Sequence, residues 1–151
     1  MTNLTWHCLP FDKLSTKEFH DIVQLRINVF VVEQNCPYPE LDNKDLEVYH
    51  VFGKQNDEVV AVARLLPPNI SYEEWSIGRV ATSESYRKLK IGHLLMDYCH
   101  EQIEQLAGKV PVRISAQLYL EKFYQSHGYL QVSDMYLEDD IEHIEMLYSP
   151  T

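Results

Sequence analysis

Three basic residues lie within four positions of one another, directly before a segment with helical periodicity. They are Arg87, Lys88 and Lys90, and Gly92 follows at the start of that segment. The first amides of a helix have no partner within it and lie at the positive end of its dipole, and glycine lets a ligand approach the backbone. This chemistry fits a pyrophosphate group. A solvated basic turn is an equally good interpretation of these residues taken alone.

This cationic loop contrasts with the rest of the chain. The 151 residues include 23 Asp and Glu against 13 Lys and Arg, which gives a formal net charge of −10 and a pI near 5.0. Such a balance argues against nucleic acid as a partner, because basic groups on phosphates supply most of that affinity. It also argues against a polybasic membrane-surface protein. The length predicts a single domain over residues 1–151.

Targeting and metal-binding signals are expected to be absent. Val59–Ala63 is one of the longest apolar runs and is far shorter than the roughly 20 residues of a spanning helix. The first ten residues lack the basic and apolar pattern of a secretory signal. Cys8, Cys36 and Cys99 are odd in number and far apart, which argues against a disulfide framework or a zinc site. We therefore expect a reducing, cytoplasmic location, with no membrane and no metal.

Three helices must position these residues. The first is predicted to begin at Ser15, because Ser15 and Glu18 have the spacing of a capping box. It must end before Cys36, where two prolines follow and prevent helical geometry. The other two are predicted from Ile91 to Leu106 and from Gln117 to His127, with Gly108 and Gly128 placed to end them; Gly108 can adopt a left-handed cap.

The strands are predicted from alternation and from runs rich in β-branched residues. Seven are expected, at Leu4–Leu9, Val48–Lys54, Glu58–Leu66, Trp75–Thr82, Val110–Ser115, Tyr129–Tyr136 and His143–Tyr148. The resulting order, β-α-β-β-β-α-β-α-β-β, predicts a mixed α/β layer fold.

Motifs in three parts of the chain resemble one family. Val80-Ala81-Thr82-x4-Arg87-x-x-Lys90-x-Gly92 is similar to the acyl-CoA-binding motif of the GNAT N-acetyltransferases, and Gln117-x5-Phe123-Tyr124-x3-Gly128-Tyr129 is similar to a second landmark of that family. The block from Val29 to Tyr38 resembles the ElaA-like branch of the family. One departure is Lys90, which replaces the first glycine of the usual motif.

The resemblance implies a fold and a co-substrate. The fold is a mostly antiparallel central sheet, flanked by helices, in which strands four and five splay apart to admit a thioester. The co-substrate is acetyl-CoA, with its pantetheine arm along the fourth strand and near Gln117, and with Lys88 near the ribose phosphate. The residues implied in cofactor binding are Val80, Ala81, Thr82, Arg87, Lys88, Leu89, Lys90, Ile91, Gly92, Gln117 and Tyr124.

The resemblance also implies amine acetylation, which needs a base for the amine and an acid for the departing thiolate. Tyr124 matches the acid of many relatives, although a core aromatic is the alternative for a residue beside Phe123. The base is left open between Glu33, His143, His50 and a water relay, in that order. Cys36 has no evident base beside it, so direct attack in a ternary complex is preferred over an acyl-enzyme.

Two further functions compete with a small-molecule or peptide amine acetyltransferase. One is a non-catalytic acyl-CoA-binding module, and the other is a structural protein that uses the hairpin of residues 136–145. Arg64 and Arg79 are expected to orient acidic partners. The acidic groups at Glu33, Glu40, Asp42 and 138–140 suggest a cationic acceptor, although charge runs are usually solvated surface. A homodimer is left open, because many relatives pair through late strands.

Overall fold

The computed structural model describes residues 4–151, apart from the side chains of Lys88 and Leu89. Its strands are β1 (Leu4–Pro10), β2 (Tyr49–Gln55), β3 (Glu58–Leu66), β4 (Ser76–Thr82), β5 (Val112–Gln117), β6 (Tyr129–Gln131), β7 (Tyr136–Glu138) and β8 (Ile141–Tyr148). Its α-helices are α1 (Thr16–Ile27), α2 (Ile91–Ala107) and α3 (Glu121–Gln125). Shorter helical turns are η1 (Phe11–Lys13), η2 (Asn28–Glu33), η3 (Asn43–Leu46), η4 (Glu84–Leu89) and η5 (Leu118–Leu120).

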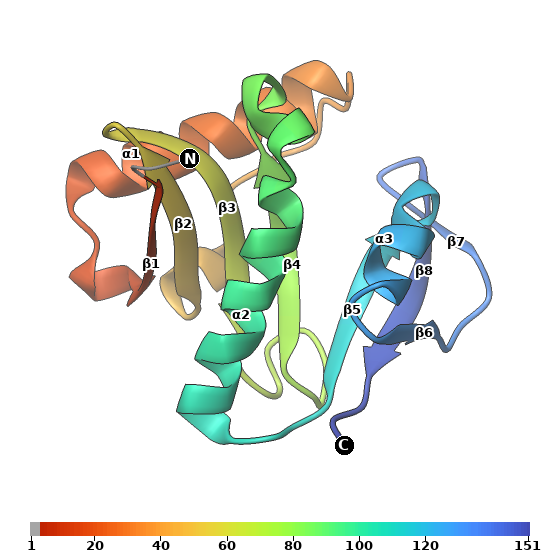
Figure 1. The fold of residues 1–151 in the computed structure, drawn as a ribbon. Helices are drawn as coiled ribbons and strands as arrows, with labels where there is room; N and C mark the ends of the chain where they lie inside the picture. The colour runs from red at the N-terminus through yellow and green to blue at the C-terminus, as the bar shows by residue number, and fades with distance from the viewer. Residues whose placement is uncertain (1–3) are drawn as a thin grey trace.

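The strands form two antiparallel sheets that diverge from one point. The first has the order β1-β2-β3-β4, and the second has the order β5-β8-β6, with β7 also paired to β8. The sheets are joined where Trp75 pairs in parallel with Val112, beside the bond from Arg113 N to Trp75 O at 2.9 Å. Figure 1 shows β4 and β5 separating from that end. The predicted splay of the fourth and fifth strands is therefore confirmed.

Helices cover both faces of the first sheet. On one face, α1 buries Ile22 and Leu25 in a cluster with Phe52 of β2. On the other face, α2 buries Leu95 and Cys99 in the larger core cluster, which also contains buried side chains of β5 and β8. The alternating and helical apolar patterns of the sequence thus close into a layered α/β structure.

The first helix begins as predicted and then changes type. Ser15 accepts a bond from Glu18 N at 3.0 Å, and Glu18 accepts one from Ser15 N at 2.8 Å, which completes the capping box. After Ile27 the chain continues as the π-helix η2, and it leaves helical geometry before Cys36. Short π-helical segments occur frequently at functional sites.

Three sequence predictions differ from the structure. The strand expected over 129–136 is divided into β6 and β7, because residues 132–135 leave the ladder with β8. The third helix is shorter than expected, since β5 extends to Gln117 and η5 precedes α3. Gly108 has φ 81° and ψ −160°, so its positive φ is as predicted but its ψ lies outside the left-handed helical region.

Candidate functional site

A bulge in β4 marks the point where the two sheets separate. Arg64 pairs with Gly78 and Val62 pairs with Ala81, so Arg79 and Val80 together face the single residue Ala63. Arg79 takes up the extra length with φ 51°, in the left-handed region. Bulges of this kind redirect side chains next to active sites. Gly78, directly before the bulged pair, is a weak local signal, because glycine inside a strand often marks a bulge. Arg79 itself is not a residue type that favours positive φ.

The cationic loop begins helix α2 with a strained residue. Lys90 is the N-cap of α2 and has φ 59° and ψ 27°, a conformation that costs an L-residue roughly 1–2 kcal/mol. This strain explains why glycine suits the position, which in this chain is occupied by a lysine. A Cβ on Gly92 would lie 3.5 Å from Phe123, an ordinary contact, so alanine also fits there. The predicted side-chain roles of Lys88 and Leu89 lie outside the described residues.

Arg87 connects this loop to η2 rather than pointing into solvent. Its guanidinium makes a bidentate pair with the Glu33 carboxylate, with Nη2 at 2.9 Å from Oε2, and donates from Nε and Nη2 to Thr82 O at 3.2 and 3.0 Å. The hydrogen bond from Arg87 lowers the pKa of Glu33. A lowered pKa makes a carboxylate a weaker base.

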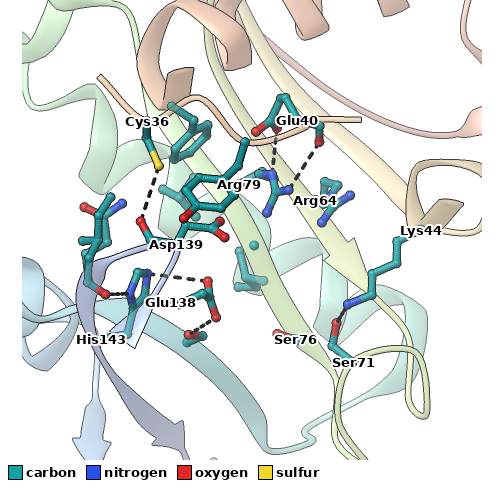
Figure 2. A pocket seen from close by; sticks show the side chains of 18 of the residues that line it. Cys36, Glu40, Lys44, Arg64, Ser71, Ser76, Arg79, Glu138, Asp139 and His143 are labelled. Atoms are coloured by element: carbon teal, nitrogen blue, oxygen red, sulfur yellow. Dashed lines mark hydrogen bonds and ion pairs between the residues drawn. The ribbon is translucent and has the colours of Figure 1, made fainter. Parts of the chain in front are cut away.

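A cleft of about 260 Å³ lies where the sheets diverge. Val80, Gln117, Tyr124 and His143 of the predicted site all line it, so residues far apart in the sequence meet in one place. Glu33 does not line this cleft, and neither do Arg87, Lys90, Ile91 and Gly92 among the loop residues whose side chains are described. Figure 2 shows the cleft and the labelled polar side chains around it.

The segment after η2 closes one side of this cleft. Gln34 and Gln117 exchange side-chain amide bonds of 3.4 and 3.5 Å. Cys36 Sγ donates to Asp139 O over 3.5 Å, and Tyr38 Oη donates to Asp140 Oδ2 over 2.9 Å. The proline-containing segment therefore bridges the first half of the chain to the turn between β7 and β8 (Figure 2).

Tyr124 is held by aromatic neighbours at the wall of the cleft. Its ring makes edge-to-face contacts with Phe123 and Tyr129 at centroid distances of 5.1 and 5.9 Å. Burial raises the pKa of Tyr124 well above its ordinary value. The hydroxyl thus keeps its proton at neutral pH, which is the state that a proton donor needs.

His143 has a defined tautomer. Its Nδ1 lies 2.7 Å from the carbonyl oxygen of Ile141, and a carbonyl only accepts, so Nδ1 carries the hydrogen. The lone pair of the neutral ring is therefore on Nε2, which lies 3.6 Å from Glu138 Oε2. This arrangement leaves Nε2 able to take a proton and places a carboxylate where it would stabilise the resulting cation.

His50 lies in the core and outside the cleft. It is fully buried between Phe11 and Phe19, and its Nε2 donates to Asp45 O over 2.8 Å. Burial lowers its pKa. These contacts favour a structural role in fixing segment 42–46.

The acidic side chains of residues 40–45 neutralise arginine side chains inside the protein. The sequence alone suggests either solvated surface or a site for a cationic acceptor. Arg26, which is 1% exposed, donates to Glu40 Oε2 at 2.8 Å and to Asp45 Oδ1 at 2.7 Å. Arg64 pairs with Asp45 at 3.0 Å, and Arg79 pairs with Glu40 at 2.7 Å. The roles expected for Arg64 and Arg79 agree with this geometry, but Arg26 was missed.

A sequence signal for this network existed. Arg26 and Arg64 each interrupt an apolar run, and a charged side chain in a buried element needs a counter-ion. The acidic stretch of residues 40–47 lies between these two arginines in the sequence. Its buried carboxylates neutralise arginines, so Glu40 cannot serve as the recognition group for a cationic acceptor.

Thiol and metal chemistry have little support among the described residues. Burial and the carboxylates of Asp139 and Asp140 raise the pKa of Cys36, which disfavours its thiolate. Within residues 4–151, no group of three or more His, Cys, Asp or Glu side chains is arranged to hold a metal ion. In the same range, no helix combines the length and apolar character needed to cross a membrane.

A divided antiparallel sheet, a bulged fourth strand and a cationic helix start beside a polar cleft define the acyl-CoA N-acyltransferase type of fold. The sequence profile of the acetyltransferase (GNAT) domain matches residues 20–149, and the chain belongs to the GNAT acetyltransferase family.

Individual relatives agree with this assignment over nearly their full length. Protein ElaA of Escherichia coli (strain K12) is 42% identical over 145 residues, which cover 95% of this chain and 95% of that protein. The crystal structure of Escherichia coli ElaA has a TM-score of 0.90 at 40% identity, covering 97% of this chain and 99% of that one. An acyl-CoA N-acyltransferase from Pseudomonas aeruginosa has a TM-score of 0.92 at 39% identity, with coverage of 97% and 99%.

Proposed function

We propose that this protein transfers an acetyl group from acetyl-CoA to the primary amine of a small molecule. The observation that carries the proposal is the geometry of His143. The neutral ring has its lone pair on Nε2 and lines a cleft between splayed strands, and Tyr124, a proton donor, lines the same cleft. Acyl transfer to an amine requires a base and an acid, and His143 of β8 and Tyr124 of α3 can supply them.

The residues present fit an acyl-CoA. The β4 edge beyond Trp75 has no partner strand in β5, so the backbone around Val80 can bind an extended arm as an added strand. The first amides of α2 and the exposed Lys90 suit a pyrophosphate. Because Arg87 already donates to Thr82 O, we propose that it stabilises the conformation of the loop. Bound acetyl-CoA would supply the activated acetyl group.

The chain's own residues then move two protons. His143 Nε2 takes the proton that the amine loses as its nitrogen bonds to the acetyl carbon, and Glu138 stabilises the imidazolium. Tyr124 Oη donates a proton to the sulfur that departs as the carbon–sulfur bond breaks. One amide and one thiol result, and both side chains regain their starting states by exchange with water. The raised pKa of the Cys36 thiol supports direct attack without an acyl-enzyme.

The test measures thiol release and product mass when the purified protein is incubated with acetyl-CoA and a panel of primary amines. We expect acceptor-dependent release, and His143→Gln should lower turnover by roughly a hundredfold or more, as for loss of a general base. Binding of CoA without acceptor-dependent release would support the non-catalytic binding module instead.

A calorimetric experiment tests the cofactor site separately. Lys90→Glu should weaken CoA binding strongly, because it places a negative charge where the pyrophosphate would bind. Lys109→Glu, at the opposite end of α2, makes the same change in net charge and should have little effect. Equal affinities for the two variants would refute the site.

A further inference from the structure

The cleft extends from the reactive groups to a second polar end. There Lys44 and Ser71 line its wall, and Lys44 Nζ donates a hydrogen bond to Ser71 Oγ over 2.7 Å. Figure 2 shows this pair on the opposite side of the cleft from His143 and Glu138. The two ends come from different parts of the chain, since Lys44 belongs to η3 and His143 belongs to β8.

The basic side chains along the cleft differ in their partners. Arg64 is paired with Asp42 and Asp45, and Arg79 is paired with Glu40, so the middle of the cleft is close to neutral. Lys44 makes a hydrogen bond to a hydroxyl group and, among the side chains that the structure describes, no ion pair. It therefore presents an uncompensated positive charge beside an O–H group, a combination that binds carboxylates well.

The end beside His143 has the opposite sign. Glu138 and Asp139 line it, and neither is paired with a lysine or arginine among the side chains described in residues 4–151. Glu138 accepts a hydrogen bond from Ser115 Oγ over 3.1 Å and lies 3.6 Å from His143 Nε2. An ammonium group would be stabilised here until His143 removes its proton.

We infer that the acceptor is a small amino carboxylate with its amine and its carboxylate at opposite ends of a short chain. The amine binds beside His143 and Glu138, and the carboxylate binds Lys44 and Ser71. This inference rests on the proposed function and names its substrate class. The volume of about 260 Å³ is slightly below the roughly 300–1,000 Å³ of drug-sized ligand sites, which favours a small acceptor.

The experiment compares ω-amino acids, from β-alanine upward, with their carboxamides as acceptors. The wild-type protein should prefer an acid of intermediate length over its amide. Lys44→Met should raise KM for the acids by about tenfold or more and leave the amides within about twofold, because only the acids lose a charge-assisted hydrogen bond. Lys109→Met serves as the matched control and should change neither value.

If Lys44→Met changes KM for the acids but not for their carboxamides, the difference cannot arise from misfolding, because both are measured on the same variant. The inference is overturned if Lys44→Met affects acids and amides equally, or if amides are preferred. If the wild-type protein acetylates nothing, the proposed function fails, and ligand-observed NMR decides the inference by itself. Selective binding of ω-amino acids that Lys44→Met abolishes would support it, and absence of binding would refute it.

Discussion

Asp45 holds two arginines in the interior of the protein, and its replacement by asparagine isolates the value of that charge. Its carboxylate accepts bonds from Arg26 at 2.7 and 3.2 Å and from Arg64 at 3.0 Å, and its side chain is 3% exposed. Asparagine keeps the shape and one oxygen but removes the negative charge. Two guanidinium groups, each 4% exposed or less, then share fewer counter-ions.

The expected cost follows from burial. Removing one partner of a buried ion pair typically costs about 3–5 kcal/mol, because the remaining charge stays buried and uncompensated. Asp42 also pairs with Arg64, at 2.7 Å, but its side chain is 36% exposed, so Asp42→Asn should cost about 1 kcal/mol or less. The two variants make the same chemical change beside the same arginine and differ in exposure.

Urea unfolding of both variants measures the difference. We expect a large decrease in the midpoint for Asp45→Asn, a small one for Asp42→Asn, and an unchanged slope for both. Equal costs, or a cost below about 1 kcal/mol for Asp45→Asn, would show that solvent reaches the network and would refute this reasoning.

The same network predicts a pH dependence. Burial alone would raise the pKa of Asp45, but the hydrogen bonds and charges of Arg26 and Arg64 outweigh it and lower the pKa. A pKa that is lower in the folded state contributes stability above its unfolded value, near 3.8. That contribution is lost as the pH falls through the lowered folded value. Asp45→Asn should therefore flatten the acid limb of the stability curve.

Three further changes test other parts of the site. Lys90→Gly should stabilise the protein by about 0.5–1 kcal/mol in urea unfolding, because glycine removes the strain of positive φ at some cost in chain entropy; a destabilised variant would contradict this. Glu33→Gln should raise KM for acetyl-CoA severalfold by releasing Arg87, and should leave the pH–rate profile unchanged. If the variant lost the rise in rate along the acidic limb, where a general base loses its proton, Glu33 would be the base. Tyr124→Phe should lower turnover by roughly tenfold or more with little change in CoA affinity, and full activity would remove Tyr124 as the acid.

Local patterns predicted much of the fold and part of the site. The capping box at Ser15, the antiparallel pairing of β2 with β3 and the cationic start of α2 each depend on residues close together in the sequence, and the structure has all three. The positions at which individual strands begin and end were predicted less accurately, as the division of strand 129–136 into β6 and β7 shows. Which residues leave a ladder depends on the partner strand, and a local pattern does not contain that information.

The sequence by itself determined the element order, the family resemblance and the cationic loop, because periodicity, caps and charge clusters act over a few residues. The tertiary structure alone decided the pairing of Glu33 with Arg87, the tautomer of His143 and the burial of Asp45. Each depends on a contact, or on burial, that only the folded chain creates. A charged or polar side chain takes its chemical role from such partners, since burial, hydrogen bonds and nearby charges set which protonation state is stable.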